Sequence, residues 1–190
     1  MTRLVRAIVL LFLGTVLVGV WLYAPLFDWL APVELDHPGP TPRRELPRRV
    51  LLVSLDGLAP WVLEQVRTPF LDRLAVEGAR ARRAETVVPS VTLTSHVSMF
   101  SGLAPDEHGV FFNRYQPWRE FRMPTVFSHC RQTRLRCGLF AGKRKFAHFA
   151  ENEPGVERYA FADSATGVLT AASRWVAEAD PDLVVVHLAE

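Results

Sequence analysis

The sequence is poor in cysteine and in net charge, and each shortage excludes a class of function. Its 190 residues include only 2 cysteines, which do not have the spacing of a zinc ribbon. Its 22 basic and 20 acidic side chains leave a net charge of +2, and no aromatic-plus-basic pattern of a single-strand binder is present. Nucleic acid is therefore not expected as a partner. The sequence also lacks a P-loop pattern and any internal repeat.

The two cysteines, Cys130 and Cys137, allow two interpretations. Outside the cytoplasm they could form a disulfide that links the end of a helix to the next strand. Alternatively, they are two buried free thiols, and this is the interpretation that we favour from the sequence.

One long run without charge is present, at residues 7–27. Apolar residues make up 49% of the chain, and their excess over a usual soluble protein lies near the N-terminus. About 20 apolar residues at a helical rise of about 1.5 Å span the core of a bilayer. We therefore expect a transmembrane anchor at residues 7–27, with a cleaved signal peptide and a buried core helix as the alternatives.

The charges around this run predict its orientation. Arg3 and Arg6 precede it, and acidic residues follow it closely. By the positive-inside rule, residues 1–6 are cytoplasmic and the remainder lies outside the cytoplasm, in the periplasm or the extracellular space. Residues 28–48 are rich in proline and are expected to form a stiff, extended linker. The globular part then begins at residue 49.

Strand and helix patterns alternate along this globular part. Apolar runs predict strands at 50–55, 84–88, 137–141 and 183–188, and caps and apolar spacing predict helices at 69–77, 92–100, 124–131 and 164–179. Strands that alternate with helices imply parallel βαβ units. The fold class expected is α/β, with a layered, mostly parallel sheet and flanking helices.

Two residues are candidates for chemistry, and such a sheet binds ligands at the carboxyl ends of its strands. Asp56 ends the first strand and could hold a metal cation, although a turn-capping Asp is the simpler interpretation. Thr92 lies where a turn enters a helix, so its hydroxyl could attack a phosphate or could merely cap the helix. Thr94 and Ser95 compete for the same roles.

Several motifs occur in a telling order. They are the runs at 50–57 (VLLVSLDG), 68–74 (TPFLDRL), 88–96 (VPSVTLTSH) and 101–110 (SGLAPDEHGV), followed by Asn113. This order resembles the alkaline phosphatase superfamily, and most closely its type I phosphodiesterase/nucleotide pyrophosphatase branch. The resemblance covers residues 49–115 well and the rest loosely.

The resemblance implies a set of site residues. Asp56 resembles the first metal ligand of the family, and Thr92 resembles its nucleophile, which also binds metal. Asn113 resembles an asparagine that hydrogen-bonds a phosphate oxygen, although it could be a turn residue. His96 and His108 match family histidines that we interpret as structural. Two divalent metal ions are implied, and zinc is the expected one.

The chain departs from the family in two places. Leu93-Thr94-Ser95 stands where the branch has Phe-Pro-Asn, which implies a different substrate preference. The remaining metal ligands of the family would fall beyond Glu190, so residues 49–190 are expected to be a truncated, inactive N-terminal part of an alkaline-phosphatase-like domain. The turn at residues 142–145, with Lys143 and Lys145, could contact phosphate, but we expect a solvated basic turn.

The expected activity of the full-length parent is metal-dependent hydrolysis of phosphodiester or pyrophosphate bonds through a threonine nucleophile. The partners implied are a phosphoester small molecule, a nucleotide or a lipid head group, together with the membrane through the N-terminal helix. A transferase or sulfatase of the same superfamily is one alternative, although the Arg motif of sulfatases is absent after Thr92. A non-catalytic, membrane-tethered α/β binding module is the other.

Overall fold

The strands form one parallel sheet. The computed structural model describes residues 49–81, 83–151 and 155–189. In these ranges a four-stranded sheet has the order β1–β4–β2–β3, with every neighbouring pair parallel. Its strands are β1 (Val50–Asp56), β2 (Cys137–Ala141), β3 (Arg158–Phe161) and β4 (Leu183–Ala189). The prediction of an α/β fold with a parallel sheet is confirmed.

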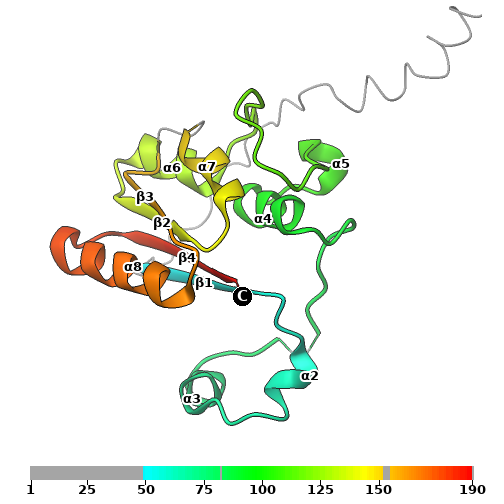
Figure 1. The fold of residues 1–190 in the computed structure, drawn as a ribbon, viewed down its shortest axis with the longest axis vertical. Helices are drawn as coiled ribbons and strands as arrows, with labels where there is room; N and C mark the ends of the chain where they lie inside the picture. The colour runs from blue at the N-terminus through cyan, green and yellow to red at the C-terminus, as the bar shows by residue number, and fades with distance from the viewer. Residues whose placement is uncertain (1–48, 82, 152–154, 190) are drawn as a thin grey trace, which may run out of the picture.

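Helices cover both faces of the sheet, as Figure 1 shows. Helix α8 (Ala165–Ala179) lies on one face, and α4 (Thr92–Ser101), α6 (Val126–Thr133) and α7 (Ala147–Glu151) lie on the other. The remaining helical segments are α2 (Pro60–Leu63), α3 (Pro69–Glu77), α5 (Pro105–His108) and the 3₁₀ turn η1 (Arg144–Phe146). Helix α3 contributes no buried residue and, with α2, stands away from the sheet.

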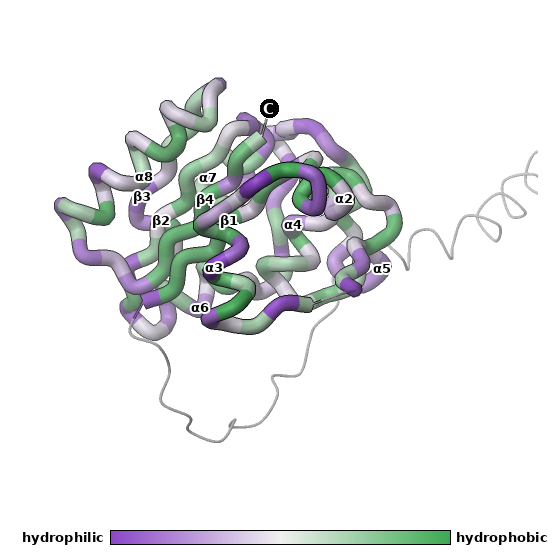
Figure 2. The backbone as a smooth tube through the Cα atoms, turned by 90° about the horizontal axis from the view of Figure 1, so that it is seen from below, coloured by the Kyte–Doolittle hydropathy of each residue, from purple (hydrophilic) through white to green (hydrophobic). Residues whose placement is uncertain are grey.

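Side chains of β4 alternate between two cores, because successive residues of a strand point to opposite faces. Val184 and Val186 pack against α8, whose buried residues are Val168, Ala172, Trp175 and Ala179. Leu183 and Val185 pack on the opposite face against a cluster that includes Phe100, Phe127, Phe146 and Phe149. Burial on both faces explains why β4 is hydrophobic almost without interruption, and the strands form part of the green, hydrophobic centre in Figure 2.

The same alternation determines which polar residues face α4. Leu52 packs with Val185 on the α4 side, so Ser54 and Asp56 lie on that face of β1. In the register of β1 and β4, Ser54 is opposite His187, two residues beyond Val185. The sheet therefore brings Ser54, Asp56 and His187 to one face, at its carboxyl edge.

Helix α4 is held in place by its apolar stripe. Leu93, Val97 and Phe100 are spaced as one helical face and are all buried. Gly102 then ends the helix with φ at 76°, in the left-handed region that glycine adopts without strain. Anchored in this way, α4 directs its first residue, Thr92, toward the end of β1.

The strand expected at 84–88 is absent. These residues form no strand in the described part of the chain, and Val88 is 85% exposed. The segment lies beside α4 instead, where the hydroxyl groups of Thr86 and Ser95 are 3.1 Å apart. Without a neighbouring strand, an apolar, β-branched sequence gains no ladder hydrogen bonds and does not become a strand.

Cys130 and Cys137 form a disulfide. The interpretation that we favoured from the sequence, two buried free thiols, is therefore wrong. Both residues are fully buried. After α6, Arg134 adopts a left-handed conformation with φ at 60°, and Leu135 donates its N–H to the carbonyl of Cys130. This tight reversal brings the start of β2 back against α6 and places the two sulfur atoms together.

The predicted cytoplasmic tail, anchor and linker, residues 1–6, 7–27 and 28–48, lie outside the described residues. Within the described ranges, no helix has both the length and the apolar character that crossing a membrane requires.

Candidate active site

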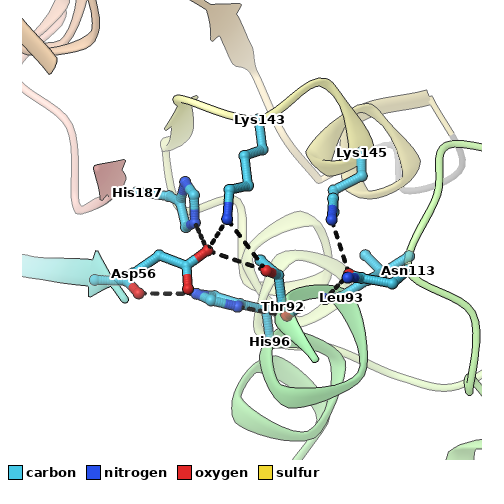
Figure 3. A network of polar contacts seen from close by, with 9 residues as sticks. Asp56, Thr92, Leu93, His96, Asn113, Lys143, Lys145 and His187 are labelled. Atoms are coloured by element: carbon cyan, nitrogen blue, oxygen red, sulfur yellow. Dashed lines mark hydrogen bonds and ion pairs between the residues drawn. The ribbon is translucent and has the colours of Figure 1, made fainter. Parts of the chain in front are cut away.

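The carboxylate of Asp56 is the centre of a polar cluster at the carboxyl edge of the sheet. Its Oδ2 atom accepts hydrogen bonds from the Thr92 hydroxyl at 3.0 Å, from the Lys143 ammonium at 2.5 Å and from His187 Nε2 at 3.2 Å (Figure 3). The ammonium of Lys143 also lies 3.4 Å from the Thr92 hydroxyl. One carboxylate oxygen therefore gathers donors from three other segments of the chain.

Each segment reaches this edge for a local reason. Asp56 is the last residue of β1, and Gly57 turns the chain away with φ at 83°. Lys143 follows the end of β2, and His187 lies near the end of the neighbouring β4. A hollow of about 400 Å³ beside Asp56 opens toward α8 and is lined by Leu55, Gly57, Leu58, Ala165, Leu188 and Ala189, so it does not include Thr92, Lys143 or His187. The arrangement is the one that open α/β sheets use for ligands.

Asp56 is ionised in this environment. Burial raises the pKa of its carboxyl, but the hydrogen bonds from Lys143 and Thr92 and the charge of Lys143 outweigh burial and lower the pKa to about 2. The carboxylate is 21% exposed and the Lys143 side chain is 36% exposed, so the pair is only partly shielded from water. A charged oxygen with limited hydration is well suited to binding a cation.

His187 is fully buried beneath Asp56. Burial, with a smaller contribution from nearby His96, lowers the pKa of His187 to about 4, so the ring is neutral at neutral pH. The ring centroid lies 4.2 Å from that of Phe146 and 5.1 Å from that of His96. Its Nδ1 atom is buried and has no hydrogen-bond partner among the described residues.

Asn113 lies on the other side of Thr92, at the start of α4. Its Oδ1 atom accepts from the Leu93 N–H at 3.0 Å and from the Lys145 ammonium at 2.8 Å (Figure 3). Burial, and secondarily the charge of Lys143, lower the pKa of Lys145. Because both contacts use the amide oxygen, the amide nitrogen is the atom through which Asn113 can donate to a ligand.

The other candidate hydroxyl groups are engaged elsewhere. Thr94 is buried and donates to the carbonyl of Val110 at 2.8 Å. Ser95 pairs with the hydroxyl of Thr86. Of the hydroxyl groups in the first turn of α4, that of Thr92 is the one that contacts Asp56.

His96 and His108 serve the framework, as we expected. His96 Nδ1 donates to the carbonyl of Thr92 at 2.7 Å, and its Nε2 lies 2.8 Å from the Ser54 hydroxyl. His108 accepts from the Val110 N–H at Nδ1 and contacts the Ser98 hydroxyl through Nε2. Both side chains are buried.

A known family matches most of the globular part of the chain. The family described as type I phosphodiesterase/nucleotide pyrophosphatase matches residues 50–188. This range includes the first residue of each of the four strands and the cluster around Asp56. The chain belongs to this family. Its membership in the alkaline phosphatase superfamily, expected from the motifs, is thereby confirmed.

One curated relative and one solved structure are similar to this chain. The rat ectonucleotide pyrophosphatase/phosphodiesterase family member 7 is 35% identical over 88 residues, which are 45% of this chain and 20% of that protein. Phosphonoacetate hydrolase from Sinorhizobium meliloti 1021, solved in complex with phosphonoacetate, shares the fold with a TM-score of 0.60 and 20% identity. That match covers 75% of this chain and 46% of the hydrolase. The chain thus spans less than half the length of either relative.

The residues present fit one side of a divalent-metal site of this family. The Asp56 carboxylate and the Thr92 hydroxyl offer two oxygen atoms 3.0 Å apart, and an ammonium cation, that of Lys143, already lies against both. Hard and borderline cations prefer such oxygen ligands. Within the described ranges, however, no group of three or more His, Cys, Asp or Glu residues could hold a metal ion. Asp56 and Thr92 would supply two of the ligands of such a site.

The sequence located some of these residues and missed others. Asp56, Thr92 and Asn113 lie around the start of α4, as the motif order implied. The prediction of a solvated basic turn at residues 142–145 was wrong, because Lys143 and Lys145 both point into the cluster. Their position just beyond the carboxyl end of β2 was the signal that placed them there. His187 was not predicted as a site residue at all.

Proposed function

We propose that the protein hydrolyses phosphodiester or pyrophosphate bonds with Thr92 as the nucleophile. The observation that carries the proposal is the hydrogen bond from the Thr92 hydroxyl to the ionised Asp56, at the start of α4. A hydroxyl group whose proton is directed at a carboxylate keeps its oxygen lone pairs available to attack phosphorus. Membership in the phosphodiesterase/pyrophosphatase family supports the same reaction class.

The neighbouring residues fit the needs of such a reaction. The first turn of α4 offers backbone N–H groups and the positive end of the helix dipole to phosphoryl oxygens. The amide nitrogen of Asn113 and the ammonium of Lys145 are additional donors on the same side. The Thr92 oxygen bonds to phosphorus as the leaving-group oxygen departs, and water then cleaves the phosphothreonine and regenerates the hydroxyl group.

We also propose that Asp56 and Thr92 hold one of two divalent metal ions, with zinc as the expected metal. A bound cation would lower the pKa of the Thr92 hydroxyl and so increase its nucleophilicity. Zinc sites use at least three protein ligands, whereas Asp56 and Thr92 supply two, so the proposal requires further ligands from outside the described residues. For the same reason, residues 1–190 alone are expected to bind zinc weakly and to be inactive.

The substrate class is an anionic phosphoester, such as a nucleotide or a lipid head group. Lys143 and Lys145 bring two ammonium groups to the cluster and favour a substrate with more than one negative charge. The solved hydrolase relative was bound to phosphonoacetate, which has that character.

We further propose that the globular part lies outside the cytoplasm. Disulfides persist in oxidising compartments, so the Cys130–Cys137 bridge supports this location. It agrees with the uncharged run at residues 7–27 as a membrane anchor whose N-terminus is cytoplasmic. An alkaline phosphatase reporter fused after Glu190 should be active only if it is exported, and cytoplasmic localisation of the fusion would refute the orientation.

The experiment that tests the nucleophile compares Thr92→Ala, Thr92→Ser and Ser95→Ala in the full-length, zinc-loaded protein. Hydrolysis of bis(p-nitrophenyl) phosphate should fall by several orders of magnitude in Thr92→Ala, as expected for loss of a nucleophile. Thr92→Ser should keep measurable activity, and Ser95→Ala should stay near the unsubstituted rate, because its hydroxyl pairs with Thr86. Near-normal turnover in Thr92→Ala would remove Thr92 from the mechanism, and it would also exclude the non-catalytic module.

A further inference from the structure

Two buried histidines lie close together, with ring centroids 5.1 Å apart, yet they contact different partners. His96 comes from α4, and His187 comes from β4 (Figure 3). His96 contacts the Thr92 carbonyl through Nδ1, whereas His187 contacts the Asp56 carboxylate through Nε2. Each ring therefore supports one of the two residues on which the proposed chemistry depends.

The partners determine where each neutral ring carries its proton. A carbonyl oxygen and a carboxylate oxygen can only accept hydrogen bonds. His96 must then carry its proton on Nδ1, and its Nε2 accepts from the Ser54 hydroxyl. His187 must carry its proton on Nε2, where it faces Asp56 Oδ2 at 3.2 Å. Two adjacent histidines are thus opposite tautomers.

His187 has no access to a substrate. Its side chain is fully buried, enclosed by the rings of Phe146 and His96. Its other nitrogen, Nδ1, has no hydrogen-bond partner among the described residues. The polar contact through which it can act is therefore the one to Asp56.

We infer that His187 is a positioning residue that holds the Asp56 carboxylate in its binding orientation by donating from Nε2 to Oδ2. The inference rests on the proposed function, in which Asp56 binds the metal beside Thr92. The donor on β4 and the carboxylate on β1 lie on adjacent, paired strands, so the contact is rigid. Some residues do not bind the metal but hydrogen-bond one of its ligands. Replacing such a residue typically lowers metal affinity or activity about 10–100-fold.

The first test measures the tautomers in the metal-free chain of 190 residues. The ¹⁵N chemical shifts of the ring nitrogens distinguish protonated from unprotonated atoms. At neutral pH, His187 should be protonated on Nε2 and His96 on Nδ1, so each ring is the internal control for the other. A proton on Nδ1 alone of His187 would leave two acceptors facing each other and would overturn the inference.

The second test uses a matched pair of variants in the full-length protein. The side-chain nitrogen of glutamine can occupy the place of histidine Nε2, whereas that of asparagine occupies the place of Nδ1. His187→Asn should weaken Zn²⁺ binding about 10–100-fold and lower kcat with little change in KM. His187→Gln should retain affinity within about threefold, because it keeps the donor to Asp56. Equal losses in both variants, or no loss in either, would overturn the positioning role.

Asp56→Asn separates this inference from the proposed function. Loss of Zn²⁺ binding in Asp56→Asn confirms that the metal lies at Asp56, so the result of the His187 pair then stands on its own. Unchanged Zn²⁺ binding in Asp56→Asn would refute the metal role of Asp56 and, with it, the positioning role of His187 toward that metal. Thermal unfolding of each variant identifies any that fail to fold.

Discussion

The ammonium of Lys143 lies against the carboxylate that is proposed to bind the metal ion. Its ammonium is 2.5 Å from Asp56 Oδ2 and 3.4 Å from the Thr92 hydroxyl, so it lies against the two atoms that the proposed metal would bind. A metal ion and this ammonium group would compete for the same oxygen atom. We therefore predict that Lys143→Met strengthens Zn²⁺ binding.

The size of the effect follows from the exposure of the pair. Hydrogen bonds to charged groups contribute about 1.5–3 kcal/mol when they are well shielded, whereas exposed ion pairs contribute about 0.2–1 kcal/mol. With Lys143 36% exposed and Asp56 21% exposed, this pair lies between those limits. A contact of about 1.4 kcal/mol corresponds to a factor of ten in a binding constant. Lys143→Met should therefore bind Zn²⁺ about tenfold more tightly.

The assay is a Zn²⁺ titration of the full-length protein by calorimetry, with Lys145→Met as the matched control. This control removes the same charge from the same turn, but Lys145 contacts Asn113 and does not contact Asp56. Its gain should stay below about threefold, as expected for a screened charge that makes no contact. No gain in Lys143→Met, or an equal gain in both variants, would refute the competition for Asp56. A rise in KM for anionic substrates in Lys143→Met would be compatible with the competition between Lys143 and the metal ion.

Two further predictions concern stability. The hydroxyl of Tyr159 is buried without a partner among the described residues, so Tyr159→Phe should raise the free energy of unfolding in urea by about 1 kcal/mol. Burial raises the pKa of Tyr159 from 10.0 to about 12, so the unfolded chain loses this proton first and stability should fall as the pH rises from 10.0 to about 12. Tyr159→Phe should flatten that decline, and an equally steep decline would contradict the assignment. Replacing Cys130 and Cys137 together by Ala should lower the free energy of unfolding by about 2–3 kcal/mol, the value for a short closed loop, and no loss would show that the bridge does not stabilise the fold.

Local sequence patterns predicted the helices well, because the caps and the apolar spacing that define a helix lie within a few residues of one another. Helix α8 begins after Ser164, whose side chain accepts from the Gly167 N–H, and its buried residues follow helical spacing. Helix α6 began two residues later than predicted. Pro124 suggested a first helical position, but Thr125 is the capping residue, and its hydroxyl accepts from the N–H groups of Phe127 and Ser128.

The two errors in the strand predictions both concern pairing with a distant partner. Strand β3 has four residues and is only partly buried, and it exists because it pairs with β2. The segment at 84–88 has a stronger strand pattern and remains irregular, because it has no neighbouring strand. A strand is stabilised by its neighbour, so β propensity alone cannot decide between these two cases.

The residues of the candidate site divide in the same way, into those that local signals predict and those that depend on a distant partner. Asp56 and Thr92 could be proposed from the sequence, because each ends or begins an element that local signals define. His187 required two facts that no local window contains: that β4 pairs with β1, and that Ser54 is opposite His187 in that pairing. Only then does the alternation of side chains place the imidazole on the face that carries Asp56. The histidine that interrupts the apolar run of β4 was visible in the sequence, but the residue that it supports lies 131 positions earlier in the chain.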